Sequence, residues 1–310
     1  MSNKVAIILS TFNGEDYIIE QIESILSQKY CGYDLFIHDD GSVDKTFEII
    51  NGYSKKYDNI NIVLNEKNIG YPGCFIKILE EIKGYQYYAF SDQDDVWENY
   101  KLSEAIQCLE TTNNSLPVLY YSAVNYTDSN LNFIRPSRFA KGKVSVCELP
   151  LQLLLFGGEA MGMTYVFNEK AKDALLKANK SGDFKDWFLK LYCASCGSVY
   201  YNPHPSAKYR RHNLAVTHSS NPSGRINRYL FQFKEIFIDK NTFEKQKIIL
   251  SYIKKYYPTD IKNENEDLYK LFLGKNTVRK MIKKVLWKKR FRSKILDEIG
   301  YRMAFFFGRI

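Results

Sequence analysis

Closely paired cysteines are almost absent from this chain of 310 residues. Its six cysteines are scattered, and only Cys193 and Cys196 stand in a Cys-x-x-Cys spacing, without the second pair expected of a four-cysteine zinc site. The first residues also lack the basic and then apolar pattern of a secretory signal. Cys193 and Cys196 lie in a stretch with a helical pattern, so we expect them to be reduced, buried thiols. We also expect the protein to be cytoplasmic.

Long apolar runs are absent as well. The nearest approach, residues 149–156, is interrupted by Pro150 and Gln152, whereas a spanning helix needs about 18 to 20 consecutive apolar residues. No internal repeat or low-complexity segment is evident. With 45% hydrophobic and 15% aromatic residues, the chain can instead form a packed globular core.

Excess positive charge is missing from most of the chain. Residues 275–310 contain twelve Lys or Arg residues against Asp297 and Glu298, so this segment carries +10 of a total net charge of +9. The preceding 274 residues therefore sum to −1. The basic character belongs to this last segment, which needs a partner of its own.

Four strand–helix units are expected in the first part of the chain. Apolar runs at residues 5–9, 34–38, 60–64 and 87–90 each precede polar turn residues and then a helical pattern, and Ser42 is a candidate N-cap of the second helix. Such units form a parallel sheet whose strand ends lie along one edge. The side chains expected to converge there are Thr11, Asn13, Asp40, Asn68, Asp92 and Asp94.

The pattern becomes less regular after a helix expected at residues 100–111. Strands are expected at residues 118–126, 163–167 and near 199–201, with a helix capped by Asn168 and another opening at residues 182–188. We interpret this half as the second side of a cleft. The sequence is helical from residue 225 onward, which places a boundary near residue 222.

Three carboxylates, Asp92, Asp94 and Asp95, follow the fourth apolar run within four residues. Asp92 and Asp94 have the spacing at which side chains of an extended strand point the same way. Like charges at a strand end repel each other unless a cation joins them, and Mg²⁺ or Mn²⁺ prefers such oxygen ligands together with phosphate. Because Asp40 follows a neighbouring strand, we expect a metal-bridged diphosphate here rather than a solvated acidic loop.

Four short motifs follow these strands in order. They are residues 10–14 (Ser-Thr-Phe-Asn-Gly), 39–44 (Asp-Asp-Gly-Ser-Val-Asp), 68–70 (Asn-Ile-Gly) and 91–97 (Ser-Asp-Gln-Asp-Asp-Val-Trp). The set resembles the inverting family-2 glycosyltransferases of GT-A fold, and the last motif is similar to that of the bacterial rhamnosyltransferase-like group. The resemblance covers about residues 3–217. It implies an α/β fold, GT-A, with a Rossmann-like, mostly parallel sheet and flanking helices. The sequence pattern after residue 225 adds a helical, basic C-terminal extension.

The resemblance also implies a division of the chain. Residues 1–222 would form the GT-A catalytic domain, with a nucleotide-sugar half at residues 1–115 and an acceptor half at residues 116–222. Residues 223–310 would form the helical basic region. The donor contacts that the resemblance implies are Thr11, Asn13, Asp40, Asn68, Gly70, Asp92, Arg210 and Arg211. Of these, Asp40 would accept a hydrogen bond from the pyrimidine N3–H.

Metal and catalytic roles follow from the same resemblance. Asp94 would hold Mg²⁺ or Mn²⁺, and His212 would reach the metal or a phosphate. Residues 185–188 (Lys-Asp-Trp-Phe) resemble the family's His-Asp-Trp-Trp, which makes Asp186 the expected catalytic base although Lys185 replaces the His. Trp187 and Glu159 are the expected acceptor contacts. A double-displacement alternative would use Glu159 as the nucleophile.

The function that the resemblance implies is transfer of L-rhamnose from dTDP-rhamnose to a lipid-linked glycan of a bacterial capsule or cell wall. UDP-galactose and UDP-glucose are the rival donors. A sugar-nucleotide nucleotidyltransferase is a rival from another class, but it should carry a Gly-rich basic loop after the first strand, whereas residues 10–14 contain one Gly and no basic residue. A non-catalytic nucleotide-binding module is the remaining rival, and homo-oligomerisation is left open.

The basic segment at residues 275–310 has a helical apolar pattern. Its apolar positions are Val278, Ile282, Val285, Leu286, Ile295 and Ile299, with Trp287, Phe291 and Phe305 to Phe307 as expected apolar anchors. This composition is typical of an interfacial amphipathic helix, so we expect peripheral attachment to the inner face of the cell membrane. The alternative is a helical face that packs on the catalytic domain or on another subunit. Nucleic-acid binding is not expected, because no recognisable module accompanies the charge.

Overall fold

The computed structural model describes residues 5–64, 68–137, 145–157, 161–180, 185–212 and 243–310, and the predicted boundary near residue 222 lies outside them. Four parallel strands form one half of a sheet, in the order β3-β2-β1-β4. Their bounds are β1 (Val5–Thr11), β2 (Tyr33–Asp39), β3 (Ile60–Val63) and β4 (Tyr87–Asp92). The predicted parallel arrangement is therefore confirmed, and the carboxyl ends of these strands lie along one edge.

A helix follows each of these strands in the chain, as predicted. They are α1 (Ile18–Leu26), α2 (Thr46–Lys56), α3 (Gly73–Glu81) and α4 (Lys101–Glu110). The cap predicted at Ser42 is wrong, because α2 begins at Thr46 with Lys45 in the cap position. Ser42 instead accepts a hydrogen bond from the backbone N–H of Asn13 at 2.9 Å, so a contact between two strand-end loops outweighs the local capping preference.

The sheet continues through strands of the second half, in the order β9-β6-β10-β5 after β4. These are β9 (Val166–Asn168), β6 (Val118–Thr127), β10 (Ser198–Arg210) and β5 (Val96–Trp97), with the short β7 (Phe133–Pro136) and β8 (Cys147–Glu148) beside them. Because β4 pairs with β9, the two predicted halves of the catalytic domain share one sheet in the described part of the chain.

Two strand predictions in this half are wrong in extent. The strand expected at residues 163–167 is only β9, because Gly162–Thr164 forms a 3₁₀ turn before it. The short strand expected near residues 199–201 is β10, which is 13 residues long. Its register against β6 shifts around Pro205, where a missing N–H interrupts the ladder, and this irregularity hid the strand from the sequence pattern.

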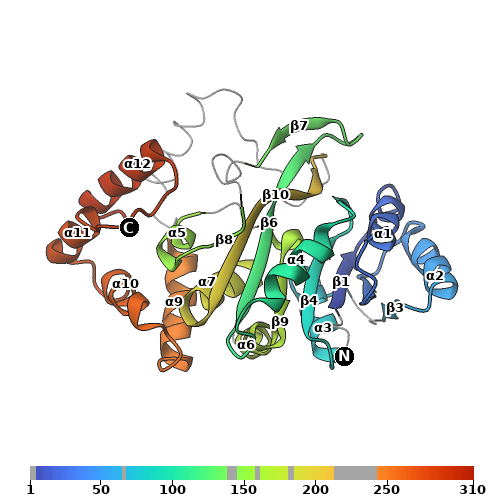
Figure 1. Cartoon of the computed structure of the whole chain (residues 1–310), viewed down its shortest axis with the longest axis horizontal. Helices are drawn as coiled ribbons and strands as arrows, with labels where there is room; N and C mark the ends of the chain where they lie inside the picture. The colour runs from blue at the N-terminus through green and yellow to red at the C-terminus, as the bar shows by residue number, and fades with distance from the viewer. Residues whose placement is uncertain (1–4, 65–67, 138–144, 158–160, 181–184, 213–242) are drawn as a thin grey trace.

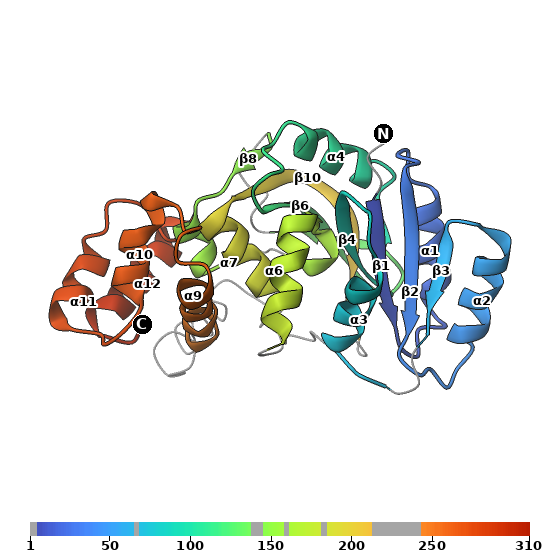
Figure 2. The same ribbon diagram turned by 90° about the horizontal axis from the view of Figure 1, so that it is seen from below.

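Helices cover both faces of the sheet, as Figures 1 and 2 show. One core lies under α1 and α4 and includes Ile22, Leu102 and Ile106. The other lies under α3 and the helices of the second half, which are α5 (Leu151–Leu155), α6 (Glu169–Asn179) and α7 (Asp186–Cys196). The predicted cap of α6 is confirmed, because the Asn168 side chain accepts a hydrogen bond from the backbone N–H of Ala171.

The C-terminal helices extend the second core away from β1–β3 (Figure 1). They are α9 (Glu244–Tyr256), α10 (Glu266–Phe272), α11 (Val278–Val285) and α12 (Ile295–Phe306), with a 3₁₀ turn at Asn263–Asn265. Phe156 lies among their aromatic rings, with centroids 5.6 Å from both Phe291 and Phe305. Phe291 and Phe305 are therefore core residues and not the exposed anchors that the sequence predicted, whereas Phe306 and Phe307 are exposed.

Candidate functional site

The loop after β1 is held against the acidic motif by Gln93. The Thr11 hydroxyl donates to Gln93 Oε1 at 2.5 Å, and the backbone N–H of Phe12 donates to the same oxygen at 2.8 Å. Asn13 has a φ of 46° and its side-chain oxygen accepts from the backbone N–H of Val43 at 2.9 Å. Thr11 and Asn13, two residues predicted to contact the sugar donor, thus lie on the segment after β1, which is cross-linked to the loops after β4 and β2.

Asp40 organises a second part of the predicted donor site. Its two carboxylate oxygens accept the backbone N–H groups of Ile69 and Gly70, both at 2.8 Å, while its carbonyl accepts from the Asn68 side chain at 2.8 Å. Gly70 has a φ of 64°, a conformation in which a side chain is strained. The structure therefore brings Asp40, Asn68 and Gly70 together, with the buried Asp40 carboxylate shaping the loop.

Asp92, Asp94 and Asp186 form an acidic cluster with Lys185. Burial raises the pKa of Asp92 to about 6, with further increases from the carboxylates of Asp94 and Asp186, while the Lys185 ammonium opposes them. The fold thus brings the expected base from α7 to the strand-end acids, across more than ninety residues of sequence. Such crowding of carboxylates is typical of a site that receives a cation.

Asp94 and His212 meet at the edge of this cluster. His212 Nε2 lies 2.8 Å from Asp94 Oδ2, and the imidazole packs on the ring of Tyr17 with centroids 4.7 Å apart. His212 Nδ1 is buried without a hydrogen-bond partner in the described part of the chain. Within that part, no group of three or more His, Cys, Asp or Glu residues is placed to hold a metal, so these two side chains would be the protein's share of the ligands.

Arg210 connects the end of β10 to its surroundings. Its Nε donates to the Asp94 carbonyl at 2.8 Å, and its terminal nitrogens donate to the Ser129 carbonyl and the Glu20 carboxylate. Its own backbone N–H donates to Asp95 Oδ1 at 3.0 Å. Arg210 therefore holds the acidic loop in place, and the donor contact predicted for it stays a prediction. The neighbouring Arg211 anchors its backbone N–H on the Thr127 carbonyl at 3.0 Å.

Asp186 begins α7 and presents a carboxylate oxygen that has no hydrogen bond. Its Oδ1 is buried and accepts none within the described residues, while Lys185 Nζ lies 3.7 Å away. The Lys185 side chain is itself buried, and its ammonium stacks 3.3 Å from the centre of the Phe75 ring. A carboxylate oxygen that is held in place but has no protein hydrogen-bond donor is available to accept a proton.

Comparison with known proteins identifies the family. Residues 6–168 match the model of Glycosyl transferase family 2. The chain is 31% identical over 217 residues to the dTDP-rhamnosyl transferase RfbG of Shigella flexneri. This match covers 66% of this chain and 71% of that protein. The chain belongs to glycosyl transferase family 2. A shorter match, 35% over 127 residues, covers 39% of this chain and 45% of the E. coli UDP-Glc:alpha-D-GlcNAc-diphosphoundecaprenol beta-1,3-glucosyltransferase WfaP.

Solved structures support the fold of the transferase. The S. aureus TarS 1-349 structure in complex with UDP-GlcNAc matches with a TM-score of 0.54 and 18% identity, over 86% of this chain and 78% of that one. The UDP complex of TarS 1-349 also gives 0.54, with 16% identity over 99% of this chain and 88% of that one. The predicted GT-A fold, with its mixed α/β architecture and C-terminal helices, is thereby confirmed.

Several residues around the site of the transferase had no predicted role. Gln93 joins the β1 loop to the acidic motif, and Asp95 anchors the end of β10. Gly162 faces Asp186 so closely that a Cβ built on it would lie 2.5 Å from both carboxylate oxygens. These roles depend on pairs of residues far apart in the sequence, so no local motif could reveal them.

The predicted acceptor side is described only in part. Glu159 lies outside the described residues. Trp187 is half-buried against the second core, and the ammonium of Lys190 lies 3.4 Å from its ring centre. Lys190 also donates to the Gly157 carbonyl at 3.3 Å, and burial lowers its pKa to about 7. One face of Trp187 is thus covered by a buried amine, and its acceptor role stays a prediction.

Lys190→Met is expected to stabilise the transferase at pH 6 by about 2 kcal/mol, because it removes a buried ammonium. The folded pKa of Lys190, about 7, is below its value of 10.5 in the unfolded chain, so the unfolded chain binds more protons between these pH values. Wild-type stability should therefore rise with pH from about 7 to 10 and the advantage of the variant should shrink. Urea unfolding across this range checks it, with Lys170→Met on the exposed side of α6 as the control. An advantage that is constant with pH would contradict the buried-charge explanation.

Proposed function

We propose that the protein is a metal-dependent, inverting glycosyltransferase that moves L-rhamnose from dTDP-rhamnose to a lipid-linked glycan acceptor of bacterial surface polysaccharide. The observation that carries this proposal is the convergence of Asp92 and Asp94, from the motif that ends β4, with Asp186 from the start of α7. The match to RfbG of Shigella flexneri supports rhamnose as the sugar, and the match to WfaP keeps a UDP-hexose as the alternative donor.

The donor would lie across the ends of β1, β2 and β4. Asp40 keeps the loop at Asn68 and Gly70 beside the proposed nucleotide position, and unused lone pairs on its carboxylate can accept the pyrimidine N3–H. The loop of Thr11 and Asn13 would form the opposite wall. Parallel sheets bind their ligands outside the carboxyl ends of the strands, which is where these groups lie.

Asp94 and His212 are the groups that would hold the metal. One carboxylate oxygen and one imidazole nitrogen, 2.8 Å apart, fit Mg²⁺ or Mn²⁺, whose other positions are normally filled by phosphate oxygens and water. When bound, such an ion neutralises charge on the departing nucleoside diphosphate.

Asp186 would act as the general base. Its free Oδ1 would accept the proton of the acceptor hydroxyl as that oxygen attacks the anomeric carbon and the bond from this carbon to the diphosphate breaks. The attack comes from the face opposite the leaving group, so the configuration inverts. Lys185, whose Nζ lies 3.7 Å from Asp186 Oδ1 and against the ring of Phe75, would help to position the carboxylate.

A donor panel tests the function. dTDP-rhamnose, UDP-glucose and UDP-galactose would each be supplied with Mg²⁺ or Mn²⁺, and release of the nucleoside diphosphate and protection from thermal unfolding would be measured. We expect dTDP-rhamnose to give the fastest release. If no nucleotide sugar is turned over and none binds in calorimetry, the proposal is wrong. If a UDP-hexose gives faster release than dTDP-rhamnose, the proposed donor changes but the proposed glycosyltransferase activity stands.

Removing divalent cations with EDTA is expected to lower turnover by about 10²-fold, because several kcal/mol of charge compensation would be lost in the transition state. Re-addition of Mn²⁺ or Mg²⁺ should restore it. His212→Ala should raise the metal concentration needed for half-maximal restoration, whereas His204→Ala, on the exposed side of β10, should not. Turnover that is insensitive to EDTA would remove the metal from the proposal.

A further inference from the structure

The last two helices expose a large apolar surface. On α11 and its C-cap the exposed apolar residues are Val278, Ile282 and Leu286, which recur every four positions and so lie on one side of the helix. On α12 and its C-cap they are Ile295, Leu296, Ile299, Met303, Phe306 and Phe307. Leu286 is 71% exposed and Phe306 64%. So many large apolar side chains exposed together mark an interaction site and not an ordinary surface.

The two apolar faces point to the same side of the molecule. The helices run antiparallel, because Asn276 before α11 donates to the Ile310 carbonyl after α12, while Arg302 of α12 donates to the Val285 carbonyl at the end of α11. Successive residues of an α-helix are about 100° apart around its axis. On each helix, the exposed apolar residues come one position after the residues that face the other helix, so they are rotated from them by about a quarter turn. Equal rotations about antiparallel axes point to one side of the pair, so the faces form one surface.

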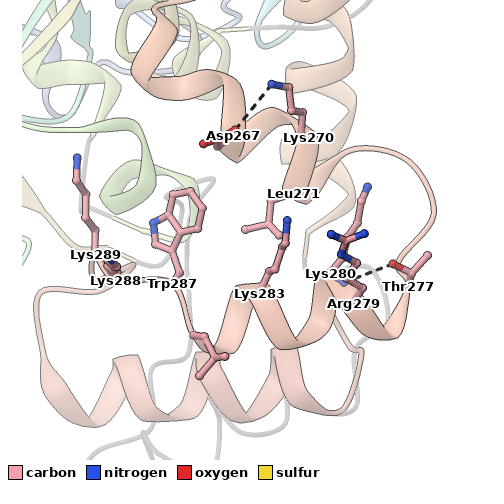
Figure 3. Close-up of a pocket in the computed structure, with 11 residues that line it drawn as sticks. Asp267, Lys270, Leu271, Thr277, Arg279, Lys280, Lys283, Trp287, Lys288 and Lys289 are labelled. Carbon is pink, nitrogen blue, oxygen red and sulfur yellow. Dashed lines mark hydrogen bonds and ion pairs between the residues drawn. The ribbon is translucent and has the colours of Figure 1, made fainter.

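A basic cavity of about 830 Å³ adjoins this surface, between α10 and α11 (Figure 3). Its basic lining residues are Lys270, Arg279, Lys280, Lys283, Lys288 and Lys289. Among the described residues Asp267 is the one acid in the lining, and its carboxylate lies 3.8 Å from Lys270. Leu286 belongs to both the cavity wall and the apolar surface, so the two features are continuous.

Trp287 supplies a further sign that the cavity receives an acceptor of hydrogen bonds. Its ring lines the cavity, and its Nε1 is buried without a partner within the described part of the chain. A buried N–H without an acceptor is unfavourable by about 1 to 3 kcal/mol, so a ligand oxygen there would be favoured. Together with the surrounding ammonium and guanidinium groups, this indicates phosphate oxygen.

The two acids of the helical pair do not offset this charge. Asp297 lies 3.4 Å from Arg292, and Glu298 lies 2.7 Å from Arg302, so both carboxylates are already paired. Apart from Lys270, the basic residues of the cavity have no carboxylate partner within the described part of the chain, and an external anion can pair with them. An apolar surface beside a positively charged cavity matches the two parts of a phospholipid, its acyl chain and its phosphate.

We propose that α11 and α12 dock the protein on a bilayer that contains anionic phospholipid, with the apolar surface at the acyl boundary and the cavity around a lipid phosphate. Within the described residues no helix is long and apolar enough to cross a membrane, and this surface instead lies along one. The contact does not depend on which sugar is transferred, so it is tested separately from the proposed function.

Vesicle sedimentation of the full chain tests this contact. Vesicles of phosphatidylcholine alone would be compared with vesicles of phosphatidylcholine mixed with phosphatidylglycerol, and stronger binding to the mixture is expected. Ile282→Glu with Ile299→Glu should weaken binding to the mixture by about tenfold or more, because two charges would enter the acyl boundary. The control is Ile248→Glu with Leu116→Glu, two exposed apolar positions elsewhere, which should bind like the wild type.

The cavity has its own variants. Lys283→Glu with Lys288→Glu should reduce binding to the phosphatidylglycerol mixture by about tenfold or more, whereas Lys55→Glu with Lys56→Glu on α2 should not. Trp287→Phe keeps the ring and removes only the N–H, so binding should weaken by about two- to tenfold. Inorganic phosphate at the same concentration as the lipid should not displace the protein.

Three results would overturn the proposal. The first is equal binding of all variants, or no binding to either vesicle. The second is displacement by inorganic phosphate, which would assign the cavity to a free anion. The third is a wild-type protein that does not bind vesicles and is dimeric in analytical ultracentrifugation, while the variant with Ile282→Glu and Ile299→Glu is monomeric. That result would assign the surface to a second copy of the chain.

Discussion

Asp186→Asn is expected to lower sugar transfer by roughly 10²- to 10⁴-fold while nucleotide binding stays nearly intact. The substitution keeps the shape of the side chain but removes its ability to take a proton from the acceptor hydroxyl. Because Asp186 lies at the start of α7 and Asp40 and Asn68 lie at other strand ends, the nucleotide contacts should be unaffected. Turnover and calorimetric binding of the nucleoside diphosphate would be measured on the same preparation.

The matched control is Asp173→Asn on the exposed side of α6, which should behave as wild type. Two outcomes would count against the base assignment. An unchanged rate would show that another group takes the proton. Loss of nucleotide binding together with turnover would show that Asp186 supports the cluster with Asp92 and Lys185 instead of acting on the acceptor.

Gly162→Ala is expected to lower turnover by about a hundredfold. The added methyl group would lie 2.5 Å from both carboxylate oxygens of Asp186, so the carboxylate or the turn must move. A displacement near 1 Å of a reacting group can lower the rate by about 10²-fold. The crowding should also destabilise the fold by about 1 to 3 kcal/mol, which thermal unfolding would detect.

Gly52→Ala on α2 is the control, because a Cβ there meets no atom within 4 Å and the helix should tolerate it. The two predictions test one another. In the background of Asp186→Asn, Gly162→Ala should add little further loss of turnover, because the base is already absent. A full additional hundredfold loss would mean that Gly162 acts through a group other than Asp186.

The first half of the fold could be predicted from the sequence, because the signals that specify it are local. Alternation of apolar runs with helical periodicity identified four strand–helix units, and parallel pairing of β1 with β2 and β4 follows from their order. The placement of polar residues at the strand ends also followed, since each motif directly succeeds its strand. The cap at Asn168 needed only its own turn of helix.

Contacts between residues far apart in the sequence could not be predicted and are seen only in the folded chain. The basic segment looked amphipathic throughout, yet Phe291 and Phe305 pack around Phe156 while Ile282 and Phe306 stay exposed. Periodicity shows that an apolar side chain lies on one side of a helix, but not whether protein covers that side. The same holds for the site: Gly162 against Asp186 and His212 against Asp94 are pairings over long sequence separations, which depend on how the whole sheet closes and not on any local pattern.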